Sequence, residues 1–366
     1  MGIKMEISTA KLQKEIDFLR QSADEIAELP CLDYPQYTDE EVAAIIAKEQ
    51  DKVEKNYRAF VGDFRKKNLY NHKTKQRDYI LLFSFPGAGK TRLSEHVHSR
   101  MLFQNPDNEF NVLDKDNYRF LFPHLHYYLK NHIDENGRFE YPATNCIRTF
   151  LDETLQKGTR SVLASGSLGA ATDFPENAEK AMKIGYHPHV VYLSVNKDVA
   201  NLSNIFRSAK IFEGIIQEGK QDCPRLIPVS YYDKFDEKKY DVLQALSDVQ
   251  KQYGDDFELS VTNRDFQTLY NSRRMPEKDV AAIVRQEEQR PLRYEELKNV
   301  RLQVYTIKQN MRKRIEHGVY IPNVKERDNT IATLDNLQRH LSSFQRQGML
   351  FVPTYYFRKL LPGKAL

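Results

Sequence analysis

Short apolar runs alternate with stretches of mixed polarity through the middle of the chain. The runs fall at residues 79–83, 110–114, 160–164, 189–194 and 257–261. Continuous apolar runs of this length are typical of buried parallel strands, because helices cover both faces of a parallel sheet. The stretches between them are long enough for crossover helices. The pattern therefore predicts an α/β fold built on a parallel sheet with helices on both faces.

Helical periodicity dominates the two flanking segments. Apolar residues recur there every three or four positions, and Thr38 with Glu41 forms a candidate capping box. We therefore predict a helical N-terminal extension over residues 1–75, a central core over 76–272 and a helical C-terminal extension over 273–366. The apolar positions expected to face a core in the extensions are Leu12, Ile16, Leu19, Ala23, Ile26, Val300, Val304, Ile307, Met311, Ile315, Ile331, Leu334, Leu337 and Leu341.

A glycine-rich loop follows the first apolar run and opens a helical stretch. It reads Ser84-Phe-Pro-Gly-Ala-Gly-Lys-Thr91, which is the order of a phosphate-binding loop of the Walker A type. Glycines let the backbone N–H groups curve around a phosphate, the lysine reaches the β- and γ-phosphates, and the threonine hydroxyl binds Mg²⁺. Ser84 stands where the consensus has glycine. The residues expected to bind the nucleotide are Pro86, Gly87, Ala88, Gly89, Lys90 and Thr91.

The composition is that of an ordinary globular protein. Of 366 residues, 29% are charged and 40% hydrophobic, and the net charge is only +4, which argues against a nucleic-acid binder. Three isolated cysteines predict a reducing compartment without a disulfide framework. We find neither an apolar run of about 18 residues nor a signal-peptide core, so no membrane association is expected. The expected location is the cytoplasm, or a target cell's cytosol after delivery without a signal peptide.

Two carboxylates follow the second apolar run. Asp114 and Asp116 are separated by one residue, and the carboxyl ends of parallel strands share the edge at which ligands bind. A kinase needs one carboxylate to take the proton of the acceptor hydroxyl and oxygen ligands for Mg²⁺. We therefore expect one role for each carboxylate: one would be the general base and the other, with Thr91, a metal ligand.

An ordered series of motifs accompanies the phosphate loop. After Asp114-Lys-Asp-Asn-Tyr-Arg119 come Pro123-His124, Gly166, Thr172-Asp-Phe-Pro175, Lys183-Ile-Gly-Tyr186, Asn204-Ile-Phe-Arg207, Pro224-Arg-Leu-Ile-Pro228 and Asn263-Arg264. This series resembles the zeta-toxin family of small-molecule kinases over about residues 79–271. The resemblance implies a P-loop kinase fold for the central core.

The resemblance also implies an activity. Zeta toxins transfer phosphate from ATP or GTP, with Mg²⁺, to a sugar hydroxyl of a nucleotide-type metabolite, best known for UDP-N-acetylglucosamine. By position, Lys90 would bind the phosphates and Asp116 would be the general base, which leaves Asp114 as the metal ligand. Arg207 and Arg225 would neutralise the transferring group, and Arg264 would contact the nucleotide. An antitoxin or a chaperone is the protein partner that the resemblance suggests, and a delivered effector is a further role to be expected.

The expected acceptor site departs from the family. The resemblance places the acceptor beside Asp116, Ser165 and Ser167, and Ser165 stands where the family has a glutamate that helps to hold the sugar. We therefore expect UDP-N-acetylglucosamine to be a poor substrate and a dinucleotide such as NAD to be a better one. Two alternatives stay open from the sequence. One is a polynucleotide or RNA end kinase, and the other is a nucleotide-binding interaction protein without transfer activity.

Overall fold

The computed structural model describes most of the core and most of the two extensions. The described residues are 8–31, scattered positions between 38 and 62, and 77–104, 106, 110–114, 148–153, 155–156, 160–218, 226–317 and 324–347. The chain forms two compact units, which we describe separately. One comprises residues 35–200 and 223–288, and the other residues 1–34, 201–222 and 289–366. The second unit thus gathers stretches that are distant in the sequence. The three-part division drawn from the sequence stays a prediction.

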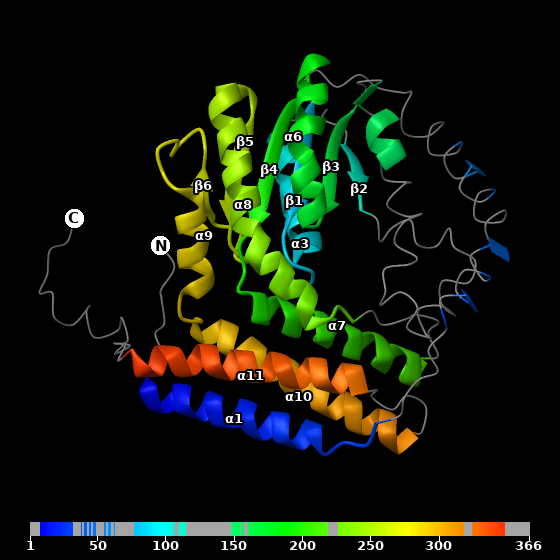
Figure 1. Cartoon of the computed structure of the whole chain (residues 1–366), viewed down its shortest axis with the longest axis vertical. Coiled ribbons are helices and arrows are strands. Elements are labelled where there is room, and N and C mark those ends of the chain that lie inside the picture. Colours follow the sequence, from blue (N-terminus) through cyan, green and yellow to red (C-terminus); the bar gives the residue numbers. More distant parts are fainter. Residues whose placement is uncertain are drawn as a thin grey trace, which may run out of the picture. The chain divides into compact units, whose positions relative to one another are not determined.

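A mostly parallel sheet forms the centre of the first unit, which we call the α/β unit (Figure 1). Its strands in the described residues lie in the order β2-β3-β1-β4-β5-β6, and only β6 is antiparallel to its neighbour. Every residue of β1 is buried, as a central strand requires. The bounds are β1 Asp78–Phe83, β2 Phe110–Leu113, β3 Ser161–Gly166, β4 His187–Leu193, β5 Glu258–Thr262 and β6 Thr268–Asn271.

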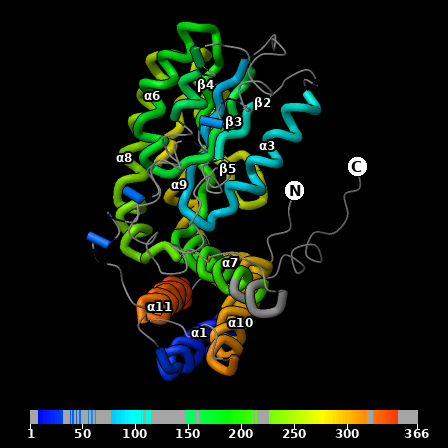
Figure 2. Tube along the Cα trace, turned by 90° about the vertical axis from the view of Figure 1, so that its right-hand side faces the viewer, coloured from blue at the N-terminus to red at the C-terminus, as the bar shows by residue number. Residues whose placement is uncertain are grey.

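Helices cover both faces of this sheet. Figure 2 shows α3 on one face, with α6 and α8 on the other, so the layered arrangement predicted from the sequence is confirmed. The ring of Phe174 on α6 packs 4.6 Å from that of Tyr79 on β1, which joins helix and sheet. The helices of this unit are α3 Lys90–Gln104, α6 Leu168–Lys183, α8 Val229–Tyr253 and α9 Val280–Gln289, and the unit also contains the first residues of α7 Lys197–Glu218.

The sequence did not predict β6. The strand pairs with β5 across a short turn at Asn263–Gln267, and its burial is mixed, so it carries little of the apolar pattern that revealed the other strands. The β3 strand also runs two residues beyond its predicted end, to Gly166. The candidate capping box is confirmed, because the Thr38 N–H donates to the Glu41 carboxylate (2.7 Å) and the Glu41 N–H to the Thr38 hydroxyl (3.2 Å).

In the second unit, which we call the helical unit, three long helices lie entirely within the described residues. They are α1 Thr9–Ala27, α10 Tyr294–His317 and α11 Val324–Arg346. The apolar stripe of α1 is buried, as its helical spacing predicted. Glu25 of α1 forms ion pairs with Lys308 (3.1 Å) and Arg312 (2.8 Å) of α10, so charged side chains border the apolar contact. The residues of α7 from Asn201 onward also belong to this unit.

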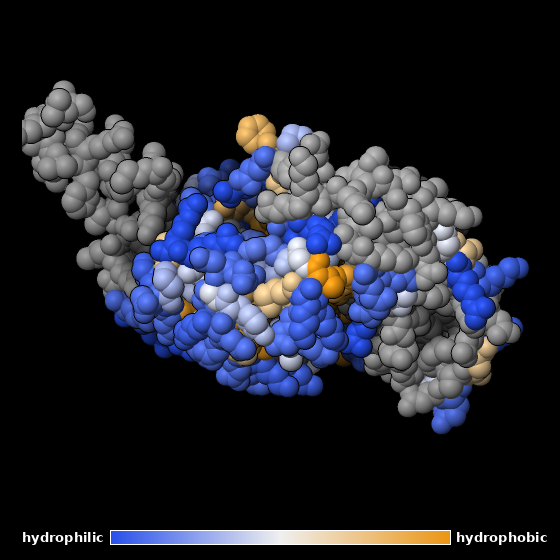
Figure 3. Space-filling model, turned by 90° about the horizontal axis from the view of Figure 1, so that it is seen from above, coloured by the Kyte–Doolittle hydropathy of each residue, from blue (hydrophilic) through white to orange (hydrophobic). Residues whose placement is uncertain are grey.

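The described surface is mainly polar. The face shown in Figure 3 is largely hydrophilic, with apolar side chains at scattered positions. Exposed apolar side chains include Phe103 on α3, and Leu302 and Tyr305 three residues apart on α10; some exposed apolar side chains are usual for protein surfaces. None of the helices in the described ranges has the length and apolarity to cross a bilayer.

Candidate nucleotide-binding site

The glycine-rich loop connects β1 to α3 as a phosphate-binding loop should. Gly87 (φ 74°) and Gly89 (φ 106°) both adopt left-handed backbone conformations that side chains disfavour. The helix begins at Lys90, and the Leu93 N–H donates to the Gly89 carbonyl (3.1 Å), which closes its first turn. The N-terminus of α3 therefore directs its positive dipole end at the loop, where an anion is stabilised.

The side chain of Lys90 runs back over the loop. Its ammonium donates to the backbone carbonyls of Ser84 (3.0 Å) and Phe85 (2.9 Å), and the residue is half-buried. A cation held at this place lies at the loop that the sequence predicted to cradle phosphate. Thr91 is exposed on the first turn of α3, so its hydroxyl is accessible to a ligand.

The serine at the first position of the loop has a structural role. Ser84 is fully buried, and its hydroxyl donates to the backbone carbonyl of Leu193 at the end of β4 (2.6 Å). The side chain therefore fastens the start of the loop to the neighbouring strand. A glycine here would leave this link unmade, so the departure from the consensus is a gain of one contact and not a loss of the loop's shape.

Asp114 lies at the same edge of the sheet as the loop. It follows Leu113, which pairs with Ala164 of β3, and Ala164 in turn pairs with Leu81 of β1. Continuing this register places Asp114 level with Ser165 and with Leu82, next to the end of β1. Asp114 is half-buried. Asp116 and Arg225 lie outside the described residues, so their roles stay predictions.

The predicted acceptor side lies at the end of β3. Ser165 and Ser167 are half-buried, and Ser167 is the residue before α6, accepting from the Ala171 N–H (3.3 Å) through its backbone carbonyl. Gly166 between them is required by packing. A Cβ there would lie 2.5 Å from the Cβ of Ala170, closer than such atoms approach. The two serines thus flank a tight strand-to-helix turn at the carboxyl ends of the parallel strands, where ligands of such sheets commonly bind.

The turn between β5 and β6 carries Arg264. Asn263 shapes it, because its side-chain oxygen accepts from the N–H groups of Asp265 and Gln267 (both 3.0 Å). Phe266 takes a left-handed conformation (φ 60°) and its ring stacks on that of His96 on α3 (4.7 Å). The turn therefore packs against the helix that follows the phosphate loop.

The contact between this turn and α3 was missed from the sequence. The guanidinium of Arg92 lies 5.7 Å from the centre of the Phe266 ring, and Arg92 directly follows Thr91 of the phosphate loop. This places half-buried Arg264 in a segment that touches the first turns of α3. The asparagine directly after an apolar strand was the available signal, since asparagine side chains commonly organise turns.

Arg207 lies on α7 in the helical unit. It is exposed, and its guanidinium donates to the Asn204 side-chain oxygen (3.4 Å). Its role in neutralising the transferring phosphoryl group stays a prediction.

The donors at the loop fit a magnesium ion better than a metal held by protein alone. The described residues contain no group of three or more histidine, cysteine or acidic side chains able to hold a metal. Magnesium in nucleotide sites usually takes one or two protein oxygens and completes its shell with phosphate oxygens and water. The hydroxyl of Thr91 and the carboxylate of Asp114 are of this kind.

Comparison with known proteins points to one family. The family model for the zeta toxin matches residues 63–275. The fold is similar to a chain from the PezAT chromosomal toxin–antitoxin system of Streptococcus pneumoniae, with a TM-score of 0.52 and 16% sequence identity. That match covers 75% of this chain and 98% of the other. Among curated protein sequences, none matched.

Proposed function

Because this chain belongs to the zeta toxin family, whose members are kinases, we propose that it transfers the γ-phosphoryl group of ATP or GTP to a hydroxyl of a nucleotide-type metabolite. The observation that carries the proposal is the phosphate loop. Gly87 and Gly89 hold left-handed conformations there, and the Lys90 ammonium lies over the loop carbonyls. This is the arrangement that binds a triphosphate at a helix N-terminus.

Each residue assigned from the sequence has a proposed task. Lys90 stabilises the negative charge on the β- and γ-phosphates as the bond to the leaving group lengthens. Asp116 takes the proton of the acceptor hydroxyl, and Arg207 and Arg225 neutralise the transferring group. Thr91 and Asp114 would hold Mg²⁺, which supplies further neutralisation of the phosphate oxygens when bound.

The decisive experiment offers the purified protein labelled ATP with a panel of acceptors. The panel contains UDP-sugars, NAD, nucleosides and short RNA, and the product is identified by its gain in mass of one phosphate. Transfer to a nucleotide-type metabolite supports the proposal. Transfer to RNA ends alone would favour a polynucleotide kinase, and nucleotide binding without any product would favour an interaction protein.

Ser165 narrows the choice of acceptor molecule. A glutamate accepts two hydrogen bonds from sugar hydroxyls, whereas serine is shorter and uncharged. Losing charged hydrogen bonds lowers affinity or rate by about ten- to a hundredfold. We therefore expect NAD to gain phosphate faster than UDP-N-acetylglucosamine when both are offered at equal concentration. Exclusive phosphorylation of the UDP-sugar would refute this choice of acceptor.

We also propose a protein partner. The solved structure that this fold resembles comes from a toxin–antitoxin system. An antitoxin-like or chaperone protein that binds this chain and blocks transfer is the corresponding expectation. Co-expression with proteins encoded beside it, followed by purification through a tag on this chain, tests the proposal.

A further inference from the structure

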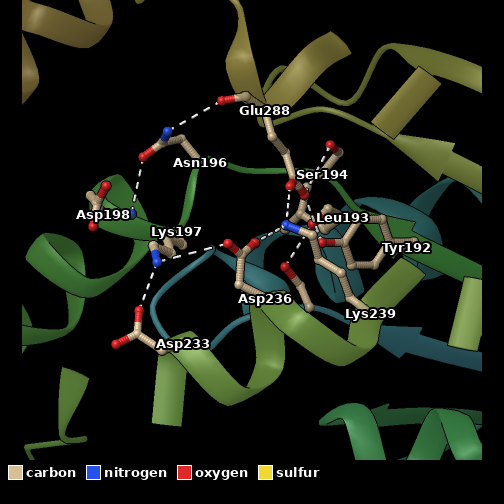
Figure 4. Close-up of polar contacts among 11 residues, drawn as sticks. Tyr192, Leu193, Ser194, Asn196, Lys197, Asp198, Asp233, Asp236, Lys239 and Glu288 are labelled. Carbon is tan, nitrogen blue, oxygen red and sulfur yellow. Dashed lines mark hydrogen bonds and ion pairs between the residues drawn. The ribbon is translucent and has the colours of Figure 1, made fainter. Parts of the chain in front are cut away.

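A polar cluster centred on a buried lysine of α8 is shown in Figure 4. It joins the end of β4, the start of α7, α8 and the end of α9, all within the α/β unit. None of its members belongs to the sites assigned above. We call this set the α8 cluster, and its members are Tyr192, Ser194, Lys197, Asp233, Asp236, Lys239 and Glu288.

The centre of the α8 cluster is a lysine with almost no exposure to solvent. Lys239 is 1% exposed, and its ammonium contacts the carboxylates of Asp236 and Glu288. Glu288, itself 5% exposed, also accepts from the Tyr192 hydroxyl (2.7 Å). Neighbouring carboxylates raise the pKa of Lys239 even though burial opposes this, so the lysine stays charged.

Such a cluster adds little net stability to the fold. Removing paired charges from water costs several kcal/mol per ion, and apolar replacements of similar volume are often as stable or more so. Buried ion pairs are, however, geometrically demanding, since each partner must lie where the other can reach it. The α8 cluster is therefore better suited to fixing positions than to strengthening the fold.

The position that it fixes is that of the phosphate loop. The Lys239 ammonium lies 5.0 Å from the centre of the Phe85 ring, and the rings of Tyr232 and Phe235 pack against the same residue at 5.9 and 4.3 Å. Phe85 has no exposure to solvent. The side of α8 that carries Lys239 thus encloses the second residue of the loop.

A direct hydrogen bond joins the same helix to the loop backbone. Tyr232, which is 1% exposed, donates from its hydroxyl to the carbonyl of Pro86 (3.1 Å). The Pro86 carbonyl and the Gly87 N–H belong to one planar trans peptide and point in opposite directions. Holding the carbonyl toward α8 therefore turns the Gly87 N–H away from α8. Backbone N–H groups of such loops bind phosphate oxygens.

We propose that Tyr232 and Lys239 are positioning residues, which orient the peptide between Pro86 and Gly87 for phosphate binding. The proposal rests on the proposed nucleotide-binding function and adds a part of the chain that the phosphate-loop motif does not contain. Neither side chain is assigned a contact with the reacting atoms. Their effect passes through Phe85 and Pro86.

The first test removes one hydroxyl. Tyr232→Phe keeps the ring and loses the bond to Pro86, and we expect the dissociation constant for ADP, measured by calorimetry, to rise about fivefold. Tyr186→Phe is the matched control. Its hydroxyl also donates to a backbone carbonyl of the same unit, that of Arg160 (2.7 Å). Arg160 lies at the start of β3, whereas the phosphate loop follows the end of β1, so this bond does not touch the loop. The control should lose comparable unfolding stability and leave ADP affinity unchanged.

The second test removes one charge. Lys239→Met keeps the length of the side chain, and we expect ADP binding to weaken more than tenfold in the folded variant. Lys308→Met is the control, because Lys308 is also nearly buried, pairs with Glu25 (3.1 Å) and lies 5.2 Å from the Phe18 ring, but in the helical unit. If Lys239→Met does not fold, Tyr232→Phe decides alone.

The outcomes separate this inference from the proposed function. Lys90→Ala, measured alongside, reports on the phosphate loop itself. If Lys90→Ala weakens ADP binding while Tyr232→Phe behaves like Tyr186→Phe, the positioning role is overturned and the nucleotide site stands. If Lys90→Ala leaves ADP binding intact, the nucleotide site itself is wrong. Weakened binding in Lys90→Ala and Tyr232→Phe, with none in either control, supports both.

Discussion

At the scale of single residues, the Ser84 hydroxyl links the phosphate loop to β4. Replacing Ser84 by Ala removes the bond to the Leu193 carbonyl within a fully buried site. We expect the free energy of unfolding to fall by about 1 to 2 kcal/mol, because a buried acceptor loses its partner. Urea denaturation measures this loss. An unchanged midpoint would show that the Leu193 carbonyl is satisfied without Ser84.

Lys90 carries the charge on which phosphoryl transfer should depend most. Lys90→Ala should lower the transfer rate about a thousandfold, corresponding to roughly 4 kcal/mol of lost charge stabilisation. Lys180→Ala is a suitable control, since that lysine is exposed on α6 and pairs with Glu176 one turn away (2.7 Å). Initial rates with saturating ATP distinguish the two variants. Near-normal turnover of folded Lys90→Ala would contradict the proposed role of the loop.

The choice between the two carboxylates after β2 can be tested directly. Asp116→Asn keeps the shape of the side chain but loses its basicity, so transfer should stop while ATP affinity changes little. Calorimetry and product formation, measured on the same preparation, separate binding from chemistry. Full activity in Asp116→Asn together with an inactive Asp114→Asn would reverse the assignment of the two residues.

At the scale of elements, strands whose residues are buried in a continuous run were the easiest to predict from the sequence. The strands β1 and β3–β5 are largely buried runs, and their apolar residues predicted them to within one or two positions. The β6 strand is partly exposed and pairs through a short turn, so pairing and not hydrophobicity makes it a strand. The predicted five-strand sheet was therefore correct but incomplete.

The candidate site divides in the same way. The phosphate loop was predictable because its chemistry is contiguous in the sequence and its glycines are dictated by backbone geometry. The role of Tyr232 was not predictable, because this residue contacts Pro86, which lies 146 residues away in the sequence. A tyrosine on an amphipathic helix is also most simply interpreted as part of the hydrophobic core. The same holds for the His96–Phe266 stacking, which depends on where the β5–β6 turn meets α3.

The pair of helices α10 and α11 contains a buried ion pair that can be tested as a unit. Arg314 (1% exposed) and Glu326 (4% exposed) form two hydrogen bonds, of 2.6 and 3.1 Å. Arg314→Met alone should lower the free energy of unfolding by about 3 to 5 kcal/mol, because the buried carboxylate of Glu326 then loses the guanidinium that balances its charge.

The matching double variant sharpens this test. Arg314→Met with Glu326→Leu should recover most of the lost stability, since no buried charge remains. Chemical denaturation of the wild type, the two single variants and the double variant gives the coupling energy. A double variant as unstable as Arg314→Met would show that packing, and not charge, explains the loss.

At the scale of the whole molecule, acid should weaken the helical unit through His340. Burial lowers the pKa of His340 to about 4, and its Nε2 has no hydrogen-bond partner in the described part of the chain. His340 is neutral in the folded protein and protonates more readily in the unfolded chain. Its contribution to the free energy of unfolding is therefore complete above about pH 6.5 and is lost as the pH falls toward 4. At pH 5 the loss should be about 2 kcal/mol.

A comparison with His340→Leu isolates this effect. The variant should show a flatter dependence of unfolding free energy on pH between 6.5 and 4.5. Glu296 is present in both proteins, so its own titration changes both profiles equally. Burial alone would raise the pKa of Glu296, but hydrogen bonds from Arg290 and Arg293 outweigh it and lower the pKa to about 2. Parallel pH profiles for the wild type and His340→Leu would contradict the prediction.

The packing of α1 against α10 and α11 has a consequence for the order of events on the ribosome. Gln13 of α1 accepts a hydrogen bond from Gln345 of α11 (2.6 Å), so these helices meet although nearly the whole α/β unit is encoded between them. At about 5 to 20 residues per second, roughly 16 to 60 s separate the emergence of α1 from that of α11. For most of that interval neither α10 nor α11 is available to cover the apolar stripe of α1, so a nascent chain must keep this helix from aggregating long after the phosphate loop has been translated.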